Sequence, residues 1–168
     1  NNKDTDLFLE AEKYEADGSY EVNYAKAHEL YEKDLKVNGN LQSIFYTSMG
    51  YWYGDGVNIN HKKSLFLSLI GVEFENFYNN YAQAAQNFKA LGEIDRAIKF
   101  LEQSLKLKNN YVYGNLLLGE IYLEDKGYID FRKAKNYLEN SIKYNKNKSR
   151  NYYKKANSKL KIVNKKLE

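Results

Sequence analysis

The sequence repeats a small residue followed, three positions later, by an aromatic residue at four places along the chain. Successive small residues lie 39, 35 and 34 positions apart. The small residues are Ala11, Gly50, Ala85 and Gly119, and their aromatic companions are Tyr14, Tyr53, Phe88 and Tyr122. A spacing of three places each pair on one face of a helix. A period of this length predicts a stack of helical repeats in which each repeat buries its apolar face against its neighbours.

A second set of small residues recurs independently, 37, 33 and 37 positions apart. Its members are Ala27, Ser64, Ala97 and Ala134. An Asn or Asp stands shortly before each of them, at Asn23, Asn60, Asp95 and Asp130. Side chains of these types accept hydrogen bonds from the free amides of a first helical turn. Each repeat is therefore predicted to contain a second helix that begins at one of these polar residues.

The two patterns together predict helices throughout the chain, with no proline to interrupt them. The predicted helices cover residues 4–16, 24–37, 41–53, 61–75, 78–91, 95–107, 111–124, 131–144 and 149–166. Glycines, which adopt left-handed turn conformations at low cost, fall between them. These turn glycines are Gly18, Gly39, Gly54, Gly56, Gly92 and Gly127.

The second and fourth repeats carry motifs that resemble a known family. Residues 49–57 read Met-Gly-Tyr-Trp-Tyr-Gly-Asp-Gly-Val and are followed by Lys63-Ser64. This segment resembles the Sel-like repeat, whose pattern is Leu-Gly, an aromatic residue, Gly-x-Gly-Val and then Lys-Ala. Residues 118–122, Leu-Gly-Glu-Ile-Tyr, with Lys133-Ala134, repeat it without the second loop glycine and the valine. Residues 91–98 have the shorter turn of a tetratricopeptide repeat, and the first repeat is the most divergent.

The resemblance implies an all-α fold, a right-handed α-α superhelical solenoid of about four helix pairs plus a C-terminal capping helix. It implies one domain over residues 1–168, with repeats at about 4–38, 41–76, 78–109 and 111–146 and the cap at 149–166. It also implies a bacterial, non-catalytic scaffold that binds another protein or a peptide. An adaptor or assembly protein and a toxin-neutralising immunity protein both fit this class, and the sequence does not choose between them.

In a solenoid of this kind the first helix of each pair lines the concave surface, where a partner is expected to bind. The candidates are the positions one and four residues beyond each small residue, which are expected to be exposed, and the position three residues before it. With Gly54 and Ala82 left out, they are Phe8, Glu12, Glu15, Thr47, Tyr51, Gln86, Lys89, Leu116, Glu120 and Leu123. In the aromatic run at 51–53, Tyr51 is expected to face outward and one of Trp52 and Tyr53 to lie in the core.

No pattern for catalysis, metal binding or cofactor binding is found. His28 and His61 are expected to be surface or capping residues, because neither has a second ligand at His-x-x-x-His spacing. Residues 54–56, Gly-Asp-Gly, are interpreted as a turn, because no strand precedes them and no Gly-Lys-Ser/Thr follows. The chain has no cysteine, which excludes disulfides and thiolate metal sites. We therefore expect no enzyme activity, no metal and no small-molecule cofactor.

The last 26 residues are strongly basic, with ten Lys or Arg against one Glu. Binding of nucleic acid or an anionic surface through this segment is the alternative function, although a solvated helix face explains such a charge run more simply. An apolar stripe predicts that the segment is the capping helix. Its members are Tyr153, Ala156, Leu160, Val163 and Leu167, and the lysines expected to face solvent are Lys154, Lys155, Lys159, Lys161, Lys165 and Lys166.

No apolar run reaches the roughly eighteen residues of a membrane span, so no span is expected. The first residues do not resemble a signal peptide either. The compartment stays open between the bacterial cytoplasm and the periplasm.

Overall fold

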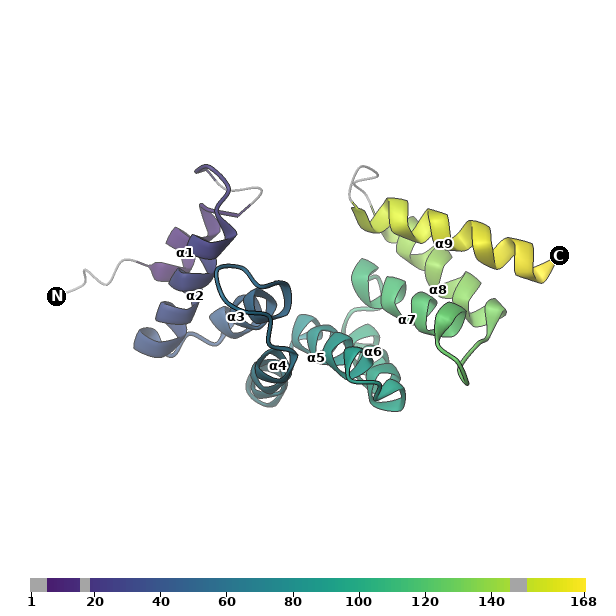
Figure 1. Cartoon of the computed structure of the whole chain (residues 1–168), viewed down its shortest axis with the longest axis horizontal. Helices are drawn as coiled ribbons and strands as arrows, with labels where there is room; N and C mark the ends of the chain where they lie inside the picture. Colours follow the sequence, from purple (N-terminus) through teal and green to yellow (C-terminus); the bar gives the residue numbers. More distant parts are fainter. Residues whose placement is uncertain (1–5, 16–18, 146–150) are drawn as a thin grey trace. The chain divides into compact units, whose positions relative to one another are not determined.

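The computed structural model describes residues 6–15, 19–145 and 151–168. Over these residues the chain is all-α, with nine helices and no strand, which confirms the predicted fold class (Figure 1). The helices are α1 (Leu7–Glu12), α2 (Tyr24–Asn38), α3 (Gln42–Tyr53), α4 (His61–Glu75), α5 (Tyr78–Ala90), α6 (Ile94–Leu107), α7 (Val112–Glu124), α8 (Phe131–Tyr144) and α9 (Asn151–Leu167). The bounds of α2 to α9 lie within two residues of the predicted ones, whereas α1 is shorter than expected.

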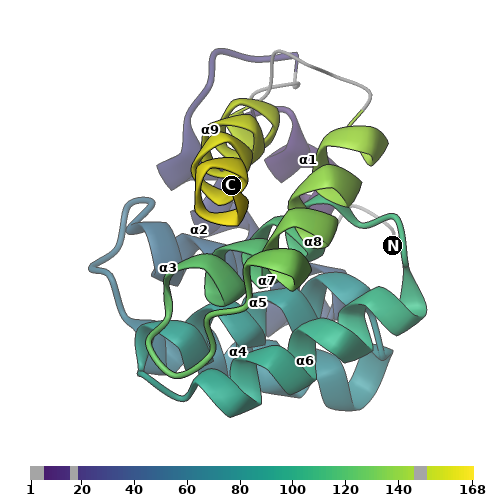
Figure 2. The same ribbon diagram turned by 90° about the vertical axis from the view of Figure 1, so that its right-hand side faces the viewer.

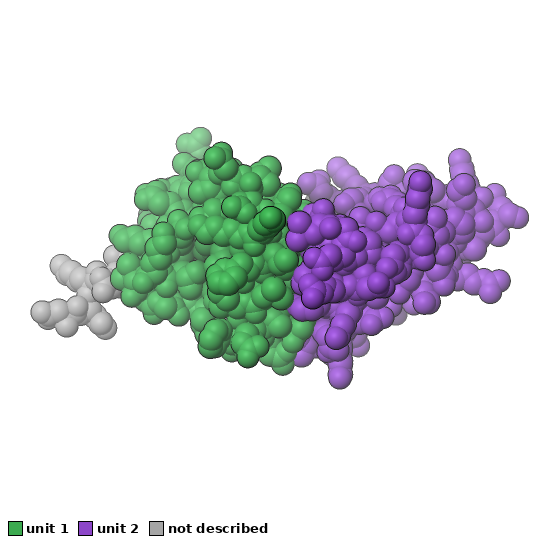
Figure 3. Space-filling model, turned by 60° about the horizontal axis from the view of Figure 1, so that its bottom comes forward, with its two compact units in different colours: residues 1–87 green, residues 88–168 purple. Residues whose placement is uncertain are grey.

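The chain divides into two compact units, residues 1–87 and 88–168 (Figure 3). In unit 1, α1 packs on α2, α2 on α3 and α3 on α4. In unit 2, α6 packs on α7, α7 on α8, and α9 on both α7 and α8 (Figures 1 and 2). These consecutive helices are therefore neighbours, as a stack of repeats requires. The expectation of one domain over residues 1–168 stays a prediction.

Hydrogen bonds confirm three of the four predicted helix starts. The side-chain oxygens of Asn23, Asn60 and Asp130 each accept from the backbone N–H three residues further on, at distances of 2.9 to 3.0 Å. These bonds satisfy one of the free amides at the start of α2, α4 and α8. The second helix of three repeats is thus fixed in register by a residue that the sequence already identifies.

The fourth predicted start, Asp95, is wrong, because α6 begins one residue earlier, at Ile94. Gly92 adopts a left-handed φ of 79°, which turns the chain immediately after α5. The backbone N–H of Glu93 then donates to the carbonyl of Phe88 at 2.9 Å. This tight turn places Asp95 in the first turn of the helix, where a negative charge is favoured by the helix dipole.

The predicted turn glycines that the structure describes all have left-handed backbone conformations. They are Gly39, Gly54, Gly56, Gly92 and Gly127, whereas Gly18 lies outside the described residues. At the end of α3, the N–H of Gly54 donates to the carbonyl of Gly50 at 2.8 Å. The left-handed residue closes the helix there and directs the chain into the loop that carries Asp55.

The small residues of both sets are buried, as the repeat pattern predicts. At Gly119, a Cβ atom would lie 2.7 Å from Cγ of Leu138 on α8. The helices α7 and α8 therefore approach each other too closely for a larger residue at this position. Among the aromatic companions, Phe88 and Tyr122 are buried and Tyr14 is half-buried, but Tyr53 is 50% exposed.

The C-terminal helix α9 turns its predicted apolar face toward α7 and α8. Ala156 and Val163 are fully buried, Tyr153 and Leu160 are half-buried, and Leu167 is exposed at the end of the helix. This burial and the contacts of α9 with α7 and α8 agree with a helix that covers the last repeat.

The prediction that the lysines of this helix face solvent is wrong for Lys159, whose side chain is 16% exposed, whereas the side chain of Lys155 is 53% exposed, as predicted. The Nζ atoms of Lys155 and Lys159 lie 2.7 Å and 3.7 Å from Oε1 of Glu120 on α7, and Lys159 also pairs with Glu124. Two of the basic side chains of α9 are therefore paired with acidic side chains of α7.

Candidate functional site

The predicted concave-face residues have different environments in the two units. In unit 1, Phe8, Glu12 and Glu15 line surface pockets, whereas Thr47 and Tyr51 are buried. Gln86 and Lys89, in the second half of α5, are half-buried, and Lys89 pairs with Asp125 at 3.3 Å. The three candidates on α7 of unit 2 are buried, with exposed fractions of 7% or less; they are Leu116, Glu120 and Leu123. The predicted exposure is therefore wrong for Tyr51, Glu120 and Leu123, and the buried Thr47 and Leu116 are inaccessible as well.

The burial of the unit 2 candidates has a simple cause. The surface of α7 that the sequence assigns to a partner packs against α8 and α9, so the chain itself occupies this position. Glu120 forms ion pairs there with Lys155 and Lys159 of α9. This part of the predicted partner surface serves instead as an internal interface of unit 2.

Tyr51 is buried because its ring fits between α2 and α4. Its hydroxyl donates to Oε1 of Glu32 at 2.8 Å, and Nζ of Lys63 lies 3.9 Å from the ring centroid. An ammonium over a tyrosine face is attracted by the ring electrons. The expected order of the aromatic run is therefore wrong: Tyr51 is inside, Trp52 is half-buried and Tyr53 is exposed.

Two pockets lie side by side in unit 1, because Tyr46 of α3 lines both. The first, which we call the aromatic groove, encloses about 440 Å³. Its walls are contributed by α1, α3 and the residues around the start of α5; they are Phe8, Glu12, Gln42, Phe45, Tyr46, Phe77 and Asn79. The rings of Phe8 and Tyr46 meet at 5.6 Å in an edge-to-face arrangement, which fixes this wall. The groove thus combines apolar rings with one exposed carboxylate, that of Glu12.

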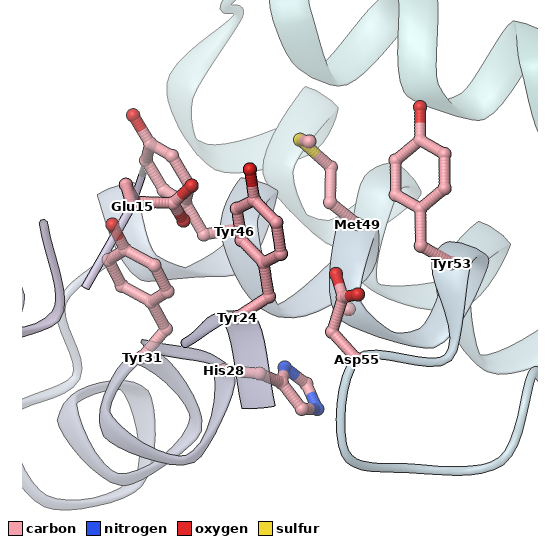
Figure 4. A pocket seen from close by; sticks show the side chains of 9 residues that line it. Glu15, Tyr24, His28, Tyr31, Tyr46, Met49, Tyr53 and Asp55 are labelled. Carbon is pink, nitrogen blue, oxygen red and sulfur yellow. The ribbon is translucent and has the colours of Figure 1, made fainter. Parts of the chain in front are cut away.

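The second pocket, which we call the tyrosine pocket, encloses about 380 Å³ (Figure 4). Four tyrosines contribute to its walls: Tyr24, Tyr31, Tyr46 and Tyr53. The rings of Tyr31 and Tyr46 stack at 4.4 Å, which makes one wall rigid. The carboxyl groups of Glu15 and Asp55 and the imidazole of His28 also line the pocket. Titratable groups of three kinds therefore meet in one partly apolar cavity.

The carboxyl groups of the tyrosine pocket are harder to ionise than ordinary ones. Burial raises the pKa of Glu15, and the negative charges of Asp55 and Glu12 raise it further. Burial also raises the pKa of Asp55, an effect that the imidazole of His28 opposes. The pocket therefore contains two mutually repelling carboxylates that are incompletely solvated.

His28 forms the floor of this pocket and is only 4% exposed, so the expectation of a surface or capping histidine is wrong. Gly50 makes room for it, since a Cβ at that position would lie 2.2 Å from Nδ1 of the imidazole. Neither ring nitrogen has a hydrogen-bond partner among the described residues. Burial lowers the pKa of His28, although Glu32 and Asp55 oppose the shift, so the ring is neutral near pH 7. A neutral imidazole has one nitrogen that accepts a hydrogen bond.

The sequence signals for this pocket were present but ambiguous. Asp55 belongs to the Gly-Asp-Gly turn, and His28 directly follows the buried Ala27. Neither spacing shows that the two residues meet, because they come from different repeats. His61, by contrast, stands at the first position of α4, as expected, with its ring 4.3 Å from that of Trp52.

The described part of the chain contains neither a metal site nor a membrane-spanning helix. No cluster of His, Asp and Glu with the arrangement of a metal site occurs there. None of the helices described combines the length and the apolar character needed to cross a membrane.

Two solved structures share the fold of this chain. The crystal structure of MamA aligns with a TM-score of 0.58 and 16% sequence identity, over 86% of this chain and 88% of that one. A Sel1 repeat protein from Oxalobacter formigenes aligns with a TM-score of 0.60 and 14% identity, over 96% of this chain and 72% of that one. No family model matches the sequence, and no curated protein matches it. The likeness confirms the Sel-like and tetratricopeptide-like repeat fold that the sequence motifs predicted.

Proposed function

We propose that this repeat fold serves as a protein-binding scaffold, and that a segment of the partner occupies the aromatic groove of unit 1. The observation that carries the proposal is the pair of adjoining pockets on either side of Tyr46. Exposed aromatic side chains that line a groove, with a few polar groups among them, are typical of surfaces that bind peptides and protein loops. Phe77 is 48% exposed at the edge of this groove.

The geometry favours unit 1 over unit 2 as the binding surface. The corresponding candidates on α7 of unit 2 are buried between the helices of that unit. In unit 1, Phe8, Glu12 and Glu15 of the original candidates line the two pockets. A partner segment in the groove would bury the ring of Phe77 and the exposed edges of Phe8 and Tyr46, which is the kind of contact that dominates binding energy.

The proposal is tested by affinity capture from a native bacterial lysate with matched variants as bait. Phe77→Ala and Glu12→Gln should reduce recovery of a captured protein, because they remove an aromatic contact and a charge from the groove. Phe66→Ala is the control, since Phe66 is 63% exposed on α4 and does not line the groove. Equal recovery with all three variants would mean that the partner binds elsewhere.

The identity of a groove-dependent partner would also distinguish the two biological roles. A toxin-like hydrolase would support an immunity protein, whereas a component of the cell envelope or of a secretion system would support an adaptor or assembly protein. We assign no catalytic role to the chain under either outcome.

Nucleic-acid binding through α9 has less support, because Lys155 and Lys159 pair with Glu120 and Glu124 of α7. If α9 binds nucleic acid, the chain should bind labelled single- or double-stranded DNA or RNA, and the affinity should fall steeply as the salt concentration rises. Substitution of exposed lysines such as Lys154 and Lys161 would then weaken the affinity, and the groove variants would not.

A further inference from the structure

We propose that the tyrosine pocket binds the cationic end of a lysine or arginine side chain presented by the partner protein. The inference deepens the proposed function and rests on it, because it names the chemistry of the group that anchors the partner. The pocket adjoins the aromatic groove through Tyr46, so a segment lying in the groove can place one side chain in the pocket. Figure 4 shows the carboxyl groups of Glu15 and Asp55, the imidazole of His28 and the tyrosine rings around one cavity.

The first argument is charge. Glu15 and Asp55 line a single cavity, and each is buried enough for its ionisation to be disfavoured. A cation placed between them would remove both the mutual repulsion and the cost of incomplete solvation. An anionic group would add to the repulsion between the two carboxylates. An apolar group would leave both carboxylates buried without a compensating charge.

The second argument is that the described residues provide no basic partner for Glu15 or Asp55. In the described part of unit 1, no ion pair joins Glu15 or Asp55 to a basic side chain. Three lysines of the helices around the pocket pair with other carboxylates, none of which lines the pocket. These pairs are Lys13–Glu10, Lys26–Glu29 and Lys63–Glu32, at 2.7, 2.9 and 3.6 Å. The pocket therefore offers acceptors that the described residues leave unused.

The third argument comes from two buried polar groups without partners. His28 is 4% exposed and Tyr31 is 1% exposed, yet the His28 nitrogens and the Tyr31 hydroxyl have no hydrogen-bond partner among the described residues. Unsatisfied buried polar groups are uncommon and costly in a folded protein. A neutral imidazole and a phenol can each accept a hydrogen bond from an ammonium or guanidinium N–H. Together with the carboxylates they match the several donors of such a group.

The fourth argument is the aromatic wall. Cations are attracted to the faces of aromatic rings, and cages of such rings are used to recognise ammonium groups. Tyr24 and Tyr53 are 44% and 50% exposed at the pocket, so their rings are accessible to an entering side chain. The alkyl part of a lysine or arginine side chain can lie against these rings while its charged end reaches the carboxylates.

The test is a titration of the isotope-labelled full chain, followed by nuclear magnetic resonance, with defined probes. The cationic probes are acetyl-Gly-Gly-Lys-Gly-Gly-amide and its arginine counterpart, and the uncharged control is the norleucine counterpart. We expect both cationic peptides to shift the amide resonances of His28, Gly50 and Asp55, with an affinity about tenfold or more above that of the norleucine peptide. If norleucine binds equally well, or if no cationic probe affects these resonances, the inference is wrong.

Matched variants attribute the binding to the pocket. Glu15→Gln with Asp55→Asn keeps the shape and removes the charge, and should weaken the lysine peptide about tenfold or more. Glu73→Gln removes a charge from the exposed surface of α4 and should have no effect. If the double variant does not fold, each single substitution is measured alone. Undiminished binding by the charge-neutral variants would overturn the inference.

A last arm identifies the source of the cation. n-Butylammonium has the charge and chain of a lysine side chain but no peptide backbone to lie in the aromatic groove. We expect it to bind more weakly than the lysine peptide, and equal affinity would point to a free amine ligand and contradict a protein partner. The experiments distinguish failure of this inference from failure of the proposed function. If Phe77→Ala reduces capture of the partner but no cationic probe binds, the inference is wrong and the scaffold function stands.

Discussion

The ion pairs between α9 and α7 lead to a quantitative prediction about the stability of unit 2. Glu120 is 6% exposed, and Lys155 and Lys159 are the basic partners that the described structure gives it. We therefore consider Lys155→Met and Lys159→Met, which keep most of the apolar stem and remove the charge. The lysine stems also contact the helix surface, so methionine is a better probe than alanine.

The expected cost depends on how many lysines remain. Lys155 is 53% exposed in its side chain, so its loss alone should cost about 0.2–1 kcal/mol, as for other exposed ion pairs. Lys159 is 16% exposed in its side chain and pairs with both Glu120 and Glu124. Loss of both lysines leaves Glu120 buried without compensation and should cost about 1–3 kcal/mol, more than the sum of the single changes. In a chain of this size each kcal/mol lowers Tm by about 2–4 °C.

Two measurements test this prediction: thermal unfolding followed by circular dichroism, and hydrogen exchange of the amides of α7. Glu120→Gln in the double-lysine background should recover most of the lost stability, because it removes the buried charge. Lys154→Met with Lys161→Met is the control, since both lysines are exposed on the same helix. A double variant no less stable than this control, or no recovery with Glu120→Gln, would refute the assignment of a structural role to these pairs.

Three further predictions follow from contacts in the two units. Gly119→Ala should lower the stability of unit 2 by about 1–3 kcal/mol in chemical denaturation, because its Cβ would lie 2.7 Å from Leu138; an unchanged midpoint would contradict the close approach of α7 and α8. Gly50→Ala should destabilise the natural chain but much less so a His28→Ala background, because the added methyl group collides with the imidazole; equal costs in both backgrounds would place His28 elsewhere. Burial raises the pKa values of Glu15 and Asp55 in the folded chain, so their ionisation opposes folding once the pH rises above the ordinary pKa values of these groups. The Glu15→Gln, Asp55→Asn variant should therefore be more stable than the natural chain near neutral pH. The difference should shrink as the pH falls through the raised pKa values and vanish below the ordinary carboxyl pKa values. A constant difference in denaturation midpoints across pH would show that charge is not the cause.

The helices could be predicted well because their signals are local. Asn23, Asn60 and Asp130 act as caps through hydrogen bonds to amides only three residues away, so each start is specified within one turn. The predicted start of α6 is wrong for an equally local reason: the tight turn at Gly92 makes Glu93 the N-cap, without a side-chain hydrogen bond, and places Asp95 inside the helix. Boundaries of this kind depend on backbone conformations that residue type alone does not fix.

The candidate site could be predicted only in part, because a pocket depends on which helices meet. Phe8, Glu12 and Glu15 were identified from their positions on the first helix of a repeat, and they do line pockets. Helical periodicity shows which face of a helix is apolar but not which residue lies opposite it. His28 of the first repeat and Asp55 of the second line the same pocket, and nothing in the spacing of either repeat reveals this.

The clearest limit of the repeat pattern is that equivalent positions have different neighbours. Glu12, Tyr51 and Glu120 each follow the small residue of a first helix, yet only Glu12 is exposed. Tyr51 fits against Glu32 and Lys63, whereas Glu120 meets the lysines of α9. Each of these buried side chains is covered by a helix that precedes or follows it in the chain. A partner can bind only where no such helix covers the surface. In the described structure the pockets around α1 are such a place. We therefore assign binding of the partner to the first repeat, although its sequence is the least typical of the four.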